Sequence, residues 1–320
     1  MPIIVRLVLA FTLSIPLAAS GQAYPDRPIN LYVGYAAGAS TDLTARALAR
    51  GLEKLLGVAV VVENKPGGSA AVAAGQVANK KPDGYTLGVI STGAITARPH
   101  LYKLPYDALK DFTLLAQYSR YIGALTVRND SPFKTIDDFI VYARANPGVS
   151  YSSPGMYTQQ HLATELFRQC KNLDFKHLPT KGGSEAAALL VGKHVDFTAG
   201  AGVHMQFVKQ GMFRMLVLYN TDRRDPNFPE IPTLKELGCD DAPALGYLIV
   251  APKDLPDPVY RKLGEAIRKV VETPEFQKTL ESFEIPYDYK DRRQLEKDLV
   301  NEYNFYKVFL DKMGAKAEGE

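Results

Sequence analysis

The sequence predicts an α/β protein with two lobes, and three observations support this prediction. Short apolar segments alternate with segments of helical periodicity along almost the whole chain. This alternation stops near residue 90 and restarts near residue 125. The chain has 320 residues, with 46% hydrophobic and 23% charged residues. That composition is typical of globular proteins, and the length suits about two domains.

The first unit of the alternation covers residues 29–90. Strands are predicted at 29–35, 58–62 and 86–90, and the second of these is rich in β-branched residues and expected to be buried on both faces. Helices are predicted at 43–56, where Gly57 ends the pattern, and at 70–79. A parallel sheet with helices on both faces is the expected result.

The second unit covers residues 125–246. Strands are predicted at 125–127, 149–152, 175–178, 195–198 and 215–219, and helices at 135–146, 160–168, 185–191 and 205–210. The segment from Thr135 to Asp138 resembles a capping box at the start of the first of these helices.

After Gly246, one strand is predicted at 247–251 and the remainder is predicted to be helical. Asp257-Pro258 and Thr273-Pro274 each indicate an N-cap followed by proline in the first helical position. The last helix, 292–313, carries one apolar stripe, made of Leu295, Leu299, Tyr303, Tyr306 and Leu310. These elements are too few for a third domain and are expected to cover the first unit. We therefore predict one lobe from residues 24–124 and 248–320, a second lobe from 125–247, and two strands crossing between them.

The first 23 residues are predicted to be a secretory signal peptide. They contain no acidic residue and one base, Arg6, followed by the apolar run 7–19 and the small residues Gly21 and Ala23. The alternative is a membrane anchor, but the run is shorter than the roughly 18 apolar residues of a spanning helix. The mature chain is therefore expected to begin at Tyr24 and to be exported, with the periplasm as its location.

Charge and cysteine content narrow the function further. The net charge of +3 is too small to indicate a nucleic-acid partner, and the mean hydropathy of −0.14 argues against a multi-span membrane protein. Cys170 and Cys239 are the two cysteines. An oxidising compartment permits a disulfide, but the sequence leaves their pairing open. No Cys-X-X-Cys motif or Cys/His cluster predicts a zinc site.

Loops of small and hydroxyl-bearing residues follow several predicted strands. The first, Ala36 to Asp42, leads into a helix whose backbone N–H groups suit a carboxylate, and Asp42 is expected to orient a donor rather than to contact an anion. A tight turn with an ordinary helix cap is the competing interpretation. Similar loops are 91–93, 152–158, 180–184 and 200–202. All lie beyond the carboxyl ends of strands, where open α/β sheets bind ligands, so a small polar ligand is predicted.

Enzyme motifs give no comparable pattern. The chain has no Gly-X-Ser-X-Gly, no Walker loop, no His-Glu-X-X-His and no dinucleotide fingerprint. His161 and Glu165 share a helix face but have no third ligand, so a helix-surface pair is favoured over a metal site. We predict no catalytic residue, no metal and no cofactor.

A series of short motifs resembles the substrate-binding receptors of tripartite tricarboxylate transporters, the Bug-type family, over residues 24–314. The motifs are YPDRPI at 24–29, AGASTD at 37–42, VENKPGG at 62–68, PDGYT at 82–86, LPYD at 104–107 before Asp111-Phe112, SPG at 153–155 with His161, KGG at 181–183, and PEIPT at 229–233. Each motif alone is weak, but their shared order and spacing are highly specific.

The resemblance implies a two-lobed periplasmic-binding-protein fold of type II, with mixed sheets and a ligand cleft that closes by a hinge. It implies that the loops after strands one and three hold one carboxylate, partly through water, while the second lobe closes over it. The residues so implied are Tyr35, Ala37, Gly38, Ala39, Ser40, Thr41, Asp42, Ser91, Thr92 and Gly93 in the first lobe, and Ser153, Pro154, Gly155, Met156, Tyr157, Thr158, His161, Lys181, Gly182 and Gly200 in the second.

This chain departs from the family pattern at several of these positions. Ala36, Ala37, Ala39 and Ser40 stand where the family usually has proline and glycines, Met156 to Gln160 replace a small-residue stretch, and Thr180 replaces a tyrosine. A kept carboxylate site with a reshaped distal half is therefore expected, compatible with a dicarboxylate or an aromatic carboxylate. The implied protein is a monomeric receptor that delivers its ligand to permease subunits. A periplasmic sensor for a signalling partner and an enzyme on the same fold are the alternatives.

Overall fold

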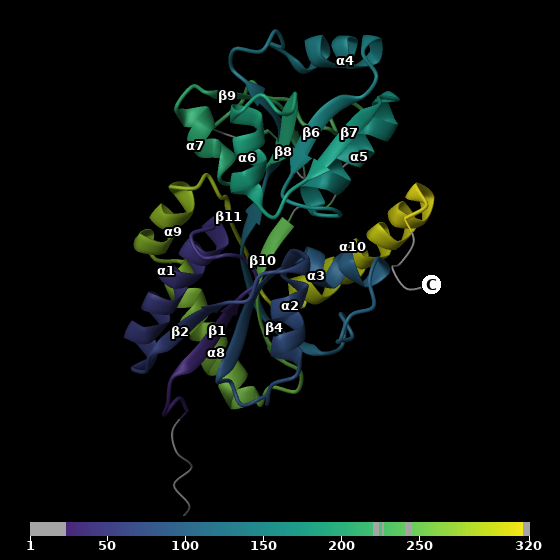
Figure 1. Ribbon diagram of the computed structural model, residues 1–320. Helices are drawn as coiled ribbons and strands as arrows, with labels where there is room; N and C mark the ends of the chain where they lie inside the picture. Colours follow the sequence, from purple (N-terminus) through teal and green to yellow (C-terminus); the bar gives the residue numbers. More distant parts are fainter. Residues whose placement is uncertain (1–23, 220–223, 226, 241–242, 244, 316–320) are drawn as a thin grey trace, which may run out of the picture.

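The structure is a computed structural model that describes residues 24–315 except 220–223, 226, 241–242 and 244. It confirms the predicted fold class: two α/β lobes lie end to end, each with its own sheet (Figure 1). The predicted signal peptide, residues 1–23, lies outside the described residues. Among the described helices, none is both long and apolar enough to cross a membrane.

The first lobe is built on a mixed six-stranded sheet in the order β11-β4-β10-β3-β1-β2. Its strands are β1 (Ile29–Val33), β2 (Val60–Asn64), β3 (Thr86–Ser91), β4 (Phe112–Tyr121), β10 (Leu245–Pro252) and β11 (Tyr287–Lys290). β1 pairs in parallel with β2 and β3, whereas β10 is antiparallel to both β3 and β4. The carboxyl ends of β1, β2 and β3 therefore share one edge of the sheet.

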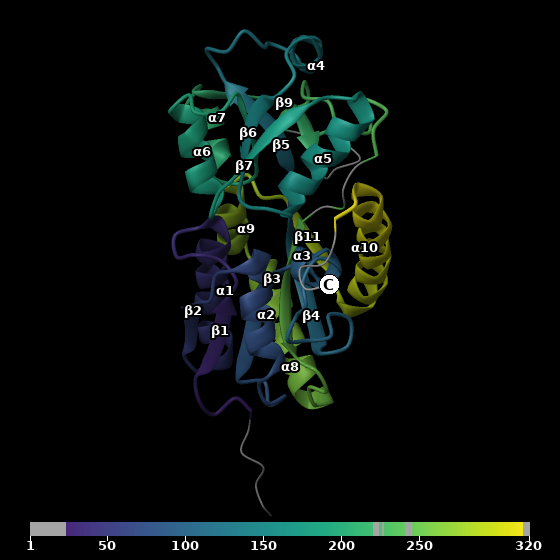
Figure 2. The same cartoon turned by 45° about the vertical axis from the view of Figure 1, so that its right-hand side comes forward.

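Helices cover both faces of this sheet. They are α1 (Ser40–Leu56), α2 (Ala71–Ala78), α3 (Gly93–Thr96), α8 (Asp257–Val271), α9 (Pro274–Glu281) and α10 (Arg292–Met313), with short 3-10 turns η1 (Gly68–Ala70) and η2 (Arg98–His100). One apolar cluster packs α1, α8 and α9 on the sheet, and another packs α2, α3 and the start of α10 on the opposite face (Figure 2).

The second lobe has a five-stranded sheet in the order β7-β6-β8-β5-β9. Its strands are β5 (Gly123–Arg128), β6 (Val149–Ser153), β7 (Phe175–Pro179), β8 (Phe197–Gly200) and β9 (Phe213–Tyr219). Its helices are α4 (Ile136–Ala145), α5 (Gln159–Lys171), α6 (Gly183–Val191) and α7 (His204–Lys209). Tyr306, Phe309 and Leu310 of α10 belong to one apolar cluster with residues of this lobe and with Ala97 and Leu101 of the first lobe, so the end of the last helix is part of a core that spans both lobes.

The chain passes between the sheets twice. β4 ends at Tyr121 and β5 begins at Gly123, and the return runs from β9 to β10 through residues 220–244. The residue boundaries that we predict for the lobes, at 124/125 and 247/248, stay a prediction. A disulfide joins Cys170, near the end of α5, to Cys239 in the return segment. The pairing that the sequence left open is therefore present.

Several sequence-based expectations were wrong in detail. β4 and β11 were not predicted, and the region after 251 is consequently not all helical. β2 is an edge strand with Val61 exposed, so it is not buried on both faces. Asp257 is the first residue of α8, with Pro256 in the N-cap position, and Tyr303 lies outside the buried stripe of α10, which uses Phe309 instead. The capping box at Thr135 and the cap at Thr273 are confirmed.

Candidate functional site

Loops from the two lobes meet directly. The Gln159 side chain of the second lobe donates from Nε2 to the Thr92 hydroxyl of the first lobe over 3.2 Å. A Cβ built on Gly202 would lie 2.8 Å from the Tyr121 ring and 3.1 Å from the Ser40 hydroxyl. The loops after β1, β3, β6 and β8, which the sequence singled out, therefore face one another.

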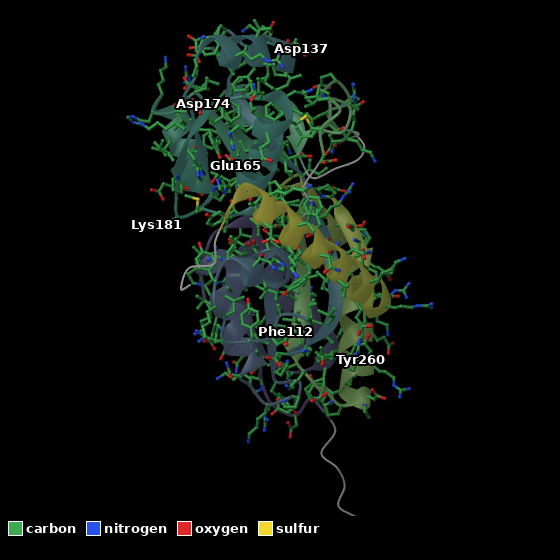
Figure 3. The ribbon with its side chains drawn as sticks, turned by 90° about the vertical axis from the view of Figure 1, so that its right-hand side faces the viewer. Phe112, Asp137, Glu165, Asp174, Lys181 and Tyr260 are labelled. Atoms are coloured by element: carbon green, nitrogen blue, oxygen red, sulfur yellow. A yellow bond between two sulfur atoms is a disulfide. The ribbon has the colours of Figure 1, made fainter. Side chains whose placement is uncertain are left out.

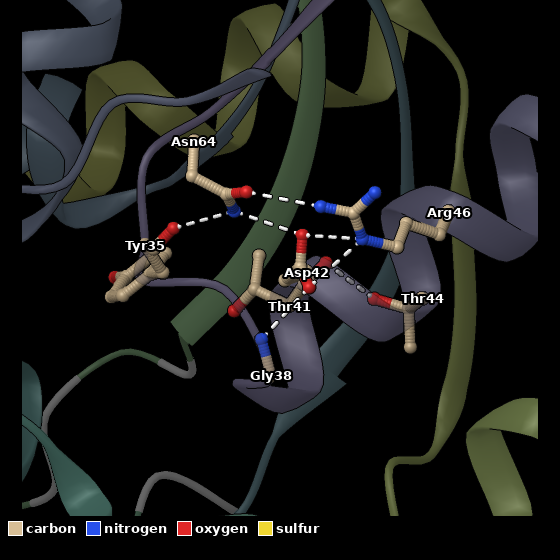
Figure 4. A network of polar contacts seen from close by, with 7 residues as sticks. All are labelled: Tyr35, Gly38, Thr41, Asp42, Thr44, Arg46 and Asn64. Atoms are coloured by element: carbon tan, nitrogen blue, oxygen red, sulfur yellow. Dashed lines mark hydrogen bonds and ion pairs between the residues drawn. The ribbon is translucent and has the colours of Figure 1, made fainter. Parts of the chain in front are cut away.

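The first of these loops is held by the Asp42 carboxylate (Figure 4). Asp42 is 2% exposed and accepts hydrogen bonds from the Gly38 N–H at 2.9 Å, from Asn64 Nδ2 at 2.8 Å and from Arg46 Nε at 3.0 Å. Asn64 Nδ2 also donates to the carbonyl of Tyr35. Burial alone would raise the pKa of Asp42, but these hydrogen bonds outweigh it, and the net pKa is lowered. Asp42 therefore stays charged and fixes the loop from behind.

The start of α1 has no side-chain cap. Ala39 occupies the N-cap position and offers no acceptor, while Ala37 and Gly38 are exposed. The first N–H groups of a helix have no partner within the helix, so they need an acceptor from elsewhere. This end of α1 lies where the second lobe approaches, because Ser40 is the residue that Gly202 faces. An anion at this point would satisfy the N–H groups.

Buried tyrosines support the same loop from the first sheet. Tyr121 of β4 hydrogen-bonds Ser40, Tyr247 of β10 hydrogen-bonds Thr41, and the Tyr121 and Tyr247 rings lie 4.7 Å apart. Burial raises the pKa of Tyr121 to about 12, so its phenol stays neutral. Sequence reasoning missed both tyrosines. For Tyr247, the only signal in the sequence was its place as the first residue of the predicted strand 247–251. Tyr121 had no such signal, because it ends β4, which was not predicted.

Thr92 links three segments at the centre of the contact between lobes. Its hydroxyl accepts from Gln159 and from the Gly246 N–H, each at 3.2 Å. Gln159 is 2% exposed, and its Oε1 has no hydrogen-bond partner among the described residues. Gln159 is absent from the residues that the sequence predicted for the site, although its neighbours Met156, Tyr157 and Thr158 are among them. Its place in the first turn of α5, behind the N-cap Thr158, brings it to the other lobe.

The loop after β6 is held within the second lobe. The Ser153 hydroxyl donates to the carbonyl of Gly155, and Thr180 Oγ1 donates to the carbonyl of Ser153. Tyr157 has a φ of 55°, a left-handed conformation that side chains other than glycine rarely adopt. Its ring packs edge-on against His161 of its own lobe and Tyr102 of the first lobe, at 5.6 and 6.4 Å between centroids.

The remaining predicted residues lie around these contacts. Ser91 and Gly93 are buried beside Thr92, and Gly200 is buried at the end of β8. Pro154 and Gly182 are partly exposed, and Met156 and Lys181 are exposed. Figure 3 shows Lys181 at the edge of the second lobe that faces the first.

His161 is buried rather than on the helix surface, which corrects the expectation of a surface pair with Glu165. Its ring stacks on His177 at 4.2 Å between centroids, and Tyr151 also stacks on His177, at 4.6 Å. Nδ1 of His161 accepts the Tyr157 N–H, while Glu165 pairs with Arg168. Burial lowers the pKa of His161 to about 4 and that of His177 to about 3. Within the described residues, no three metal-binding side chains cluster here or elsewhere.

Lowering the pH from 7 to 4.5 is expected to reduce the free energy of unfolding through His161. Its folded pKa lies below its ordinary value of 6.5, so the unfolded chain binds more protons in between. The stabilisation is complete above pH 6.5 and is lost as the pH falls toward 4, by roughly 2–3 kcal/mol at pH 4.5. Urea unfolding at both pH values measures this change.

The matched comparison is His161→Gln against His194→Gln, since His194 is exposed. The first substitution is expected to reduce the loss of stability at pH 4.5 by roughly the 2–3 kcal/mol that His161 contributes, while His177 and His204, whose pKa values burial also lowers, keep their own contributions. The second substitution is expected to leave the pH dependence as in the wild type. An unchanged slope in His161→Gln would show that this ring does not resist protonation.

Comparisons with known proteins match almost the whole chain to one family. The family model described as "Tripartite tricarboxylate transporter family receptor" matches residues 44–314. A Cupriavidus necator protein, named "UPF0065 protein in gbd 5'region", is 35% identical over 307 residues, covering 95% of this chain and 93% of that protein.

Two solved structures are similar over nearly their whole length. The periplasmic binding protein BugD has a TM-score of 0.82 and 28% identity, covering 92% of this chain and 100% of that one. An R. palustris protein solved with adipate has a TM-score of 0.83 and 25% identity, covering 91% and 98%.

Proposed function

Because the chain belongs to the tripartite tricarboxylate transporter receptor family, we propose that it captures a small organic carboxylate between its lobes and delivers it to the permease subunits of such a transporter. In this proposal the protein is a periplasmic monomer, and it releases the ligand chemically unchanged. The adipate in a structural neighbour supports a carboxylate as the ligand class.

The observation that carries the proposal is the uncapped start of α1 at the contact between lobes. Asp42 fixes the loop through the Gly38 N–H, so the remaining N–H groups of the first turn are held in place for an acceptor. Fixed backbone donors at a helix N-terminus stabilise a carboxylate without a cation in contact with it. The hydroxyl groups of Ser40 and Thr92 each lie at a contact between the lobes, the first near Gly202 and the second against Gln159.

The test is a thermal-shift screen of residues 24–320 against mono-, di- and tricarboxylates and aromatic acids. A ligand that binds only the folded state stabilises it by about 2.7 kcal/mol at a hundred times its dissociation constant, so a true ligand raises the melting temperature. Protein freed of any co-purified ligand that responds to no carboxylate would contradict the proposal.

We further propose that the lobes close on the ligand by a hinge, and Gly202→Ala tests this step. Gly202 has a φ of 67°, and a Cβ there would meet Tyr121 and Ser40 across the contact between lobes. The substitution is expected to weaken carboxylate binding at least tenfold, because the second lobe no longer approaches the first. Isothermal titration measures the loss.

Gly211→Ala is the matched control. Gly211 has a φ of 70°, but a Cβ there meets no atom within 4 Å, so the two substitutions share the backbone strain of order 1–3 kcal/mol and differ in the clash. Equal affinities in the two variants would mean that binding does not require this approach.

A periplasmic sensor remains the second candidate, since it would use the same site. Only the partner differs, and transport assays in cells lacking the permease subunits separate the two functions.

A further inference from the structure

Among the described residues, no acidic side chain pairs with the guanidinium of Arg98. Arg98 begins η2, five residues after Gly93, and its buried Nε has no hydrogen-bond acceptor within the described part of the chain. By contrast, the partly buried Arg46, Arg168 and Lys290 each contact a carboxylate, at 3.0, 2.7 and 2.6 Å.

The guanidinium lies among the loops of the candidate site. It stacks over the Tyr102 ring at 3.8 Å, and a Cβ on Gly68, in the loop after β2, would lie 3.3 Å from its Nη2. Its charge also acts on the Tyr35 phenol, where burial raises the pKa and Arg98 opposes that rise. Tyr102 in turn meets Tyr157 of the second lobe. Arg98 therefore lies beside the loops after β1 and β2, behind an aromatic contact between lobes.

Removing a cation from water without an anion is unfavourable, and stacking on one ring offsets only part of that cost. The planar stack also holds the fork of the guanidinium in one orientation, which suits two-point binding of a carboxylate. An unpaired guanidinium that is held in one orientation beside a ligand site is typical of a group that binds an anionic part of the ligand.

We propose that Arg98 determines specificity by pairing with a second anionic group of the ligand. This inference rests on the proposed function: the start of α1 takes one carboxylate, and Arg98 takes the other acidic group. The ligand is then a diacid, and a monoacid leaves the guanidinium unpaired. Tyr102 of the first lobe and Tyr157 of the second lobe form an aromatic contact over the guanidinium, and this contact limits the access of water to the ion pair.

The wild-type protein provides the first test. Titration calorimetry compares each diacid with its monomethyl ester, which has the same carbon chain but one carboxylate fewer. The diacids are the straight-chain series from malonate to pimelate, which includes adipate, and the aromatic diacid phthalate. For the diacid that binds best, we expect at least tenfold tighter binding than for its half-ester, as a charge-assisted pair contributes. A preference below twofold for every pair overturns the inference, whether or not any variant folds.

Arg98→Gln is the second test, with Arg50→Gln as control. Arg50 is an exposed arginine of α1, so both variants lose one charge from the first lobe. We expect the ratio of diacid to half-ester affinity to fall by about tenfold to a hundredfold in Arg98→Gln and to stay at the wild-type value in Arg50→Gln. Arg98→Lys keeps the positive charge but loses the planar guanidinium that can bind a carboxylate at two points. Its ratio of diacid to half-ester affinity is expected to lie between those of Arg98→Gln and Arg50→Gln.

The outcomes separate this inference from the function on which it rests. Binding of carboxylates with a ratio that Arg98→Gln leaves unchanged means that Arg98 is only a packing residue, while the receptor function stands. The absence of binding by any mono-, di- or tricarboxylate or aromatic acid removes the receptor function itself.

Discussion

Asp42→Ala is expected to weaken carboxylate binding by about a hundredfold and to lower the free energy of unfolding by about 2–4 kcal/mol. The carboxylate of Asp42 is the common acceptor of Gly38, Asn64 and Arg46. Removing it takes the shared acceptor from a partly buried network and frees the loop whose N–H groups are proposed to bind the ligand. Titration calorimetry and urea unfolding measure the two effects.

Asp137→Ala is the control, because Asp137 is an exposed acid in the first turn of α4 (Figure 3). It is expected to change stability by less than about 0.5 kcal/mol and to leave binding intact. Wild-type affinity in Asp42→Ala would show that the loop keeps its shape without this carboxylate.

The same network predicts a dependence on acid. The folded pKa of Asp42 is lowered, so its contribution is complete above the ordinary pKa of 3.8 and is lost as the pH falls through the folded value. The Asp42 carboxylate is therefore expected to stay charged at pH 4.5, where protonation of His161 already lowers the free energy of unfolding, and to lose its contribution only at lower pH. Urea unfolding of the wild type and of Asp42→Ala below pH 4.5 measures this contribution.

Loss of the disulfide between Cys170 and Cys239 is expected to lower the free energy of unfolding by about 4 kcal/mol. The two cysteines are 69 residues apart, and cross-linking a loop of that length restricts the unfolded chain by about this amount. The bond also ties α5 to the return segment, where Lys171 Nζ donates to the carbonyl of Leu237.

Urea unfolding with and without a reductant measures the effect. A variant with both cysteines replaced by serine serves as control, since the reductant then has no bond to break. The reduced wild-type protein and the double variant are expected to have similar stability. If reduction leaves the unfolding midpoint unchanged, the bond does not constrain the unfolded state as expected.

Most of the fold was predictable because its elements have local signals. The parallel strands of the first sheet are short apolar segments next to amphipathic helices, and the last helix was predicted with its observed bounds, Arg292–Met313. β4 was missed because Gln117 and Ser119 interrupt its apolar pattern, although both are buried. Gln117 is satisfied by Asp288 of β11, a residue 171 positions away that no local pattern connects to it.

The candidate site divides in the same way. The loops after β1, β3, β6 and β8 were identified because glycine, serine and threonine at strand ends form a local pattern. Tyr121, Gln159 and Arg98 were missed, since each acquires its place through a contact with a distant segment. A tyrosine, a glutamine and an arginine in a sequence have many ordinary roles, and only their neighbours distinguish those roles.

The sequence by itself determined the α/β class, the order of the elements other than β4 and β11, the small-residue loops and the family resemblance, because periodicity, capping and motif spacing are properties of neighbouring residues. Only the tertiary structure decided which loops meet, that Cys170 pairs with Cys239, that His161 is buried and that Arg98 has no acidic partner among the described residues. Burial and charge pairing depend on residues brought together from distant parts of the chain, and these are the quantities that determine the chemistry of a site.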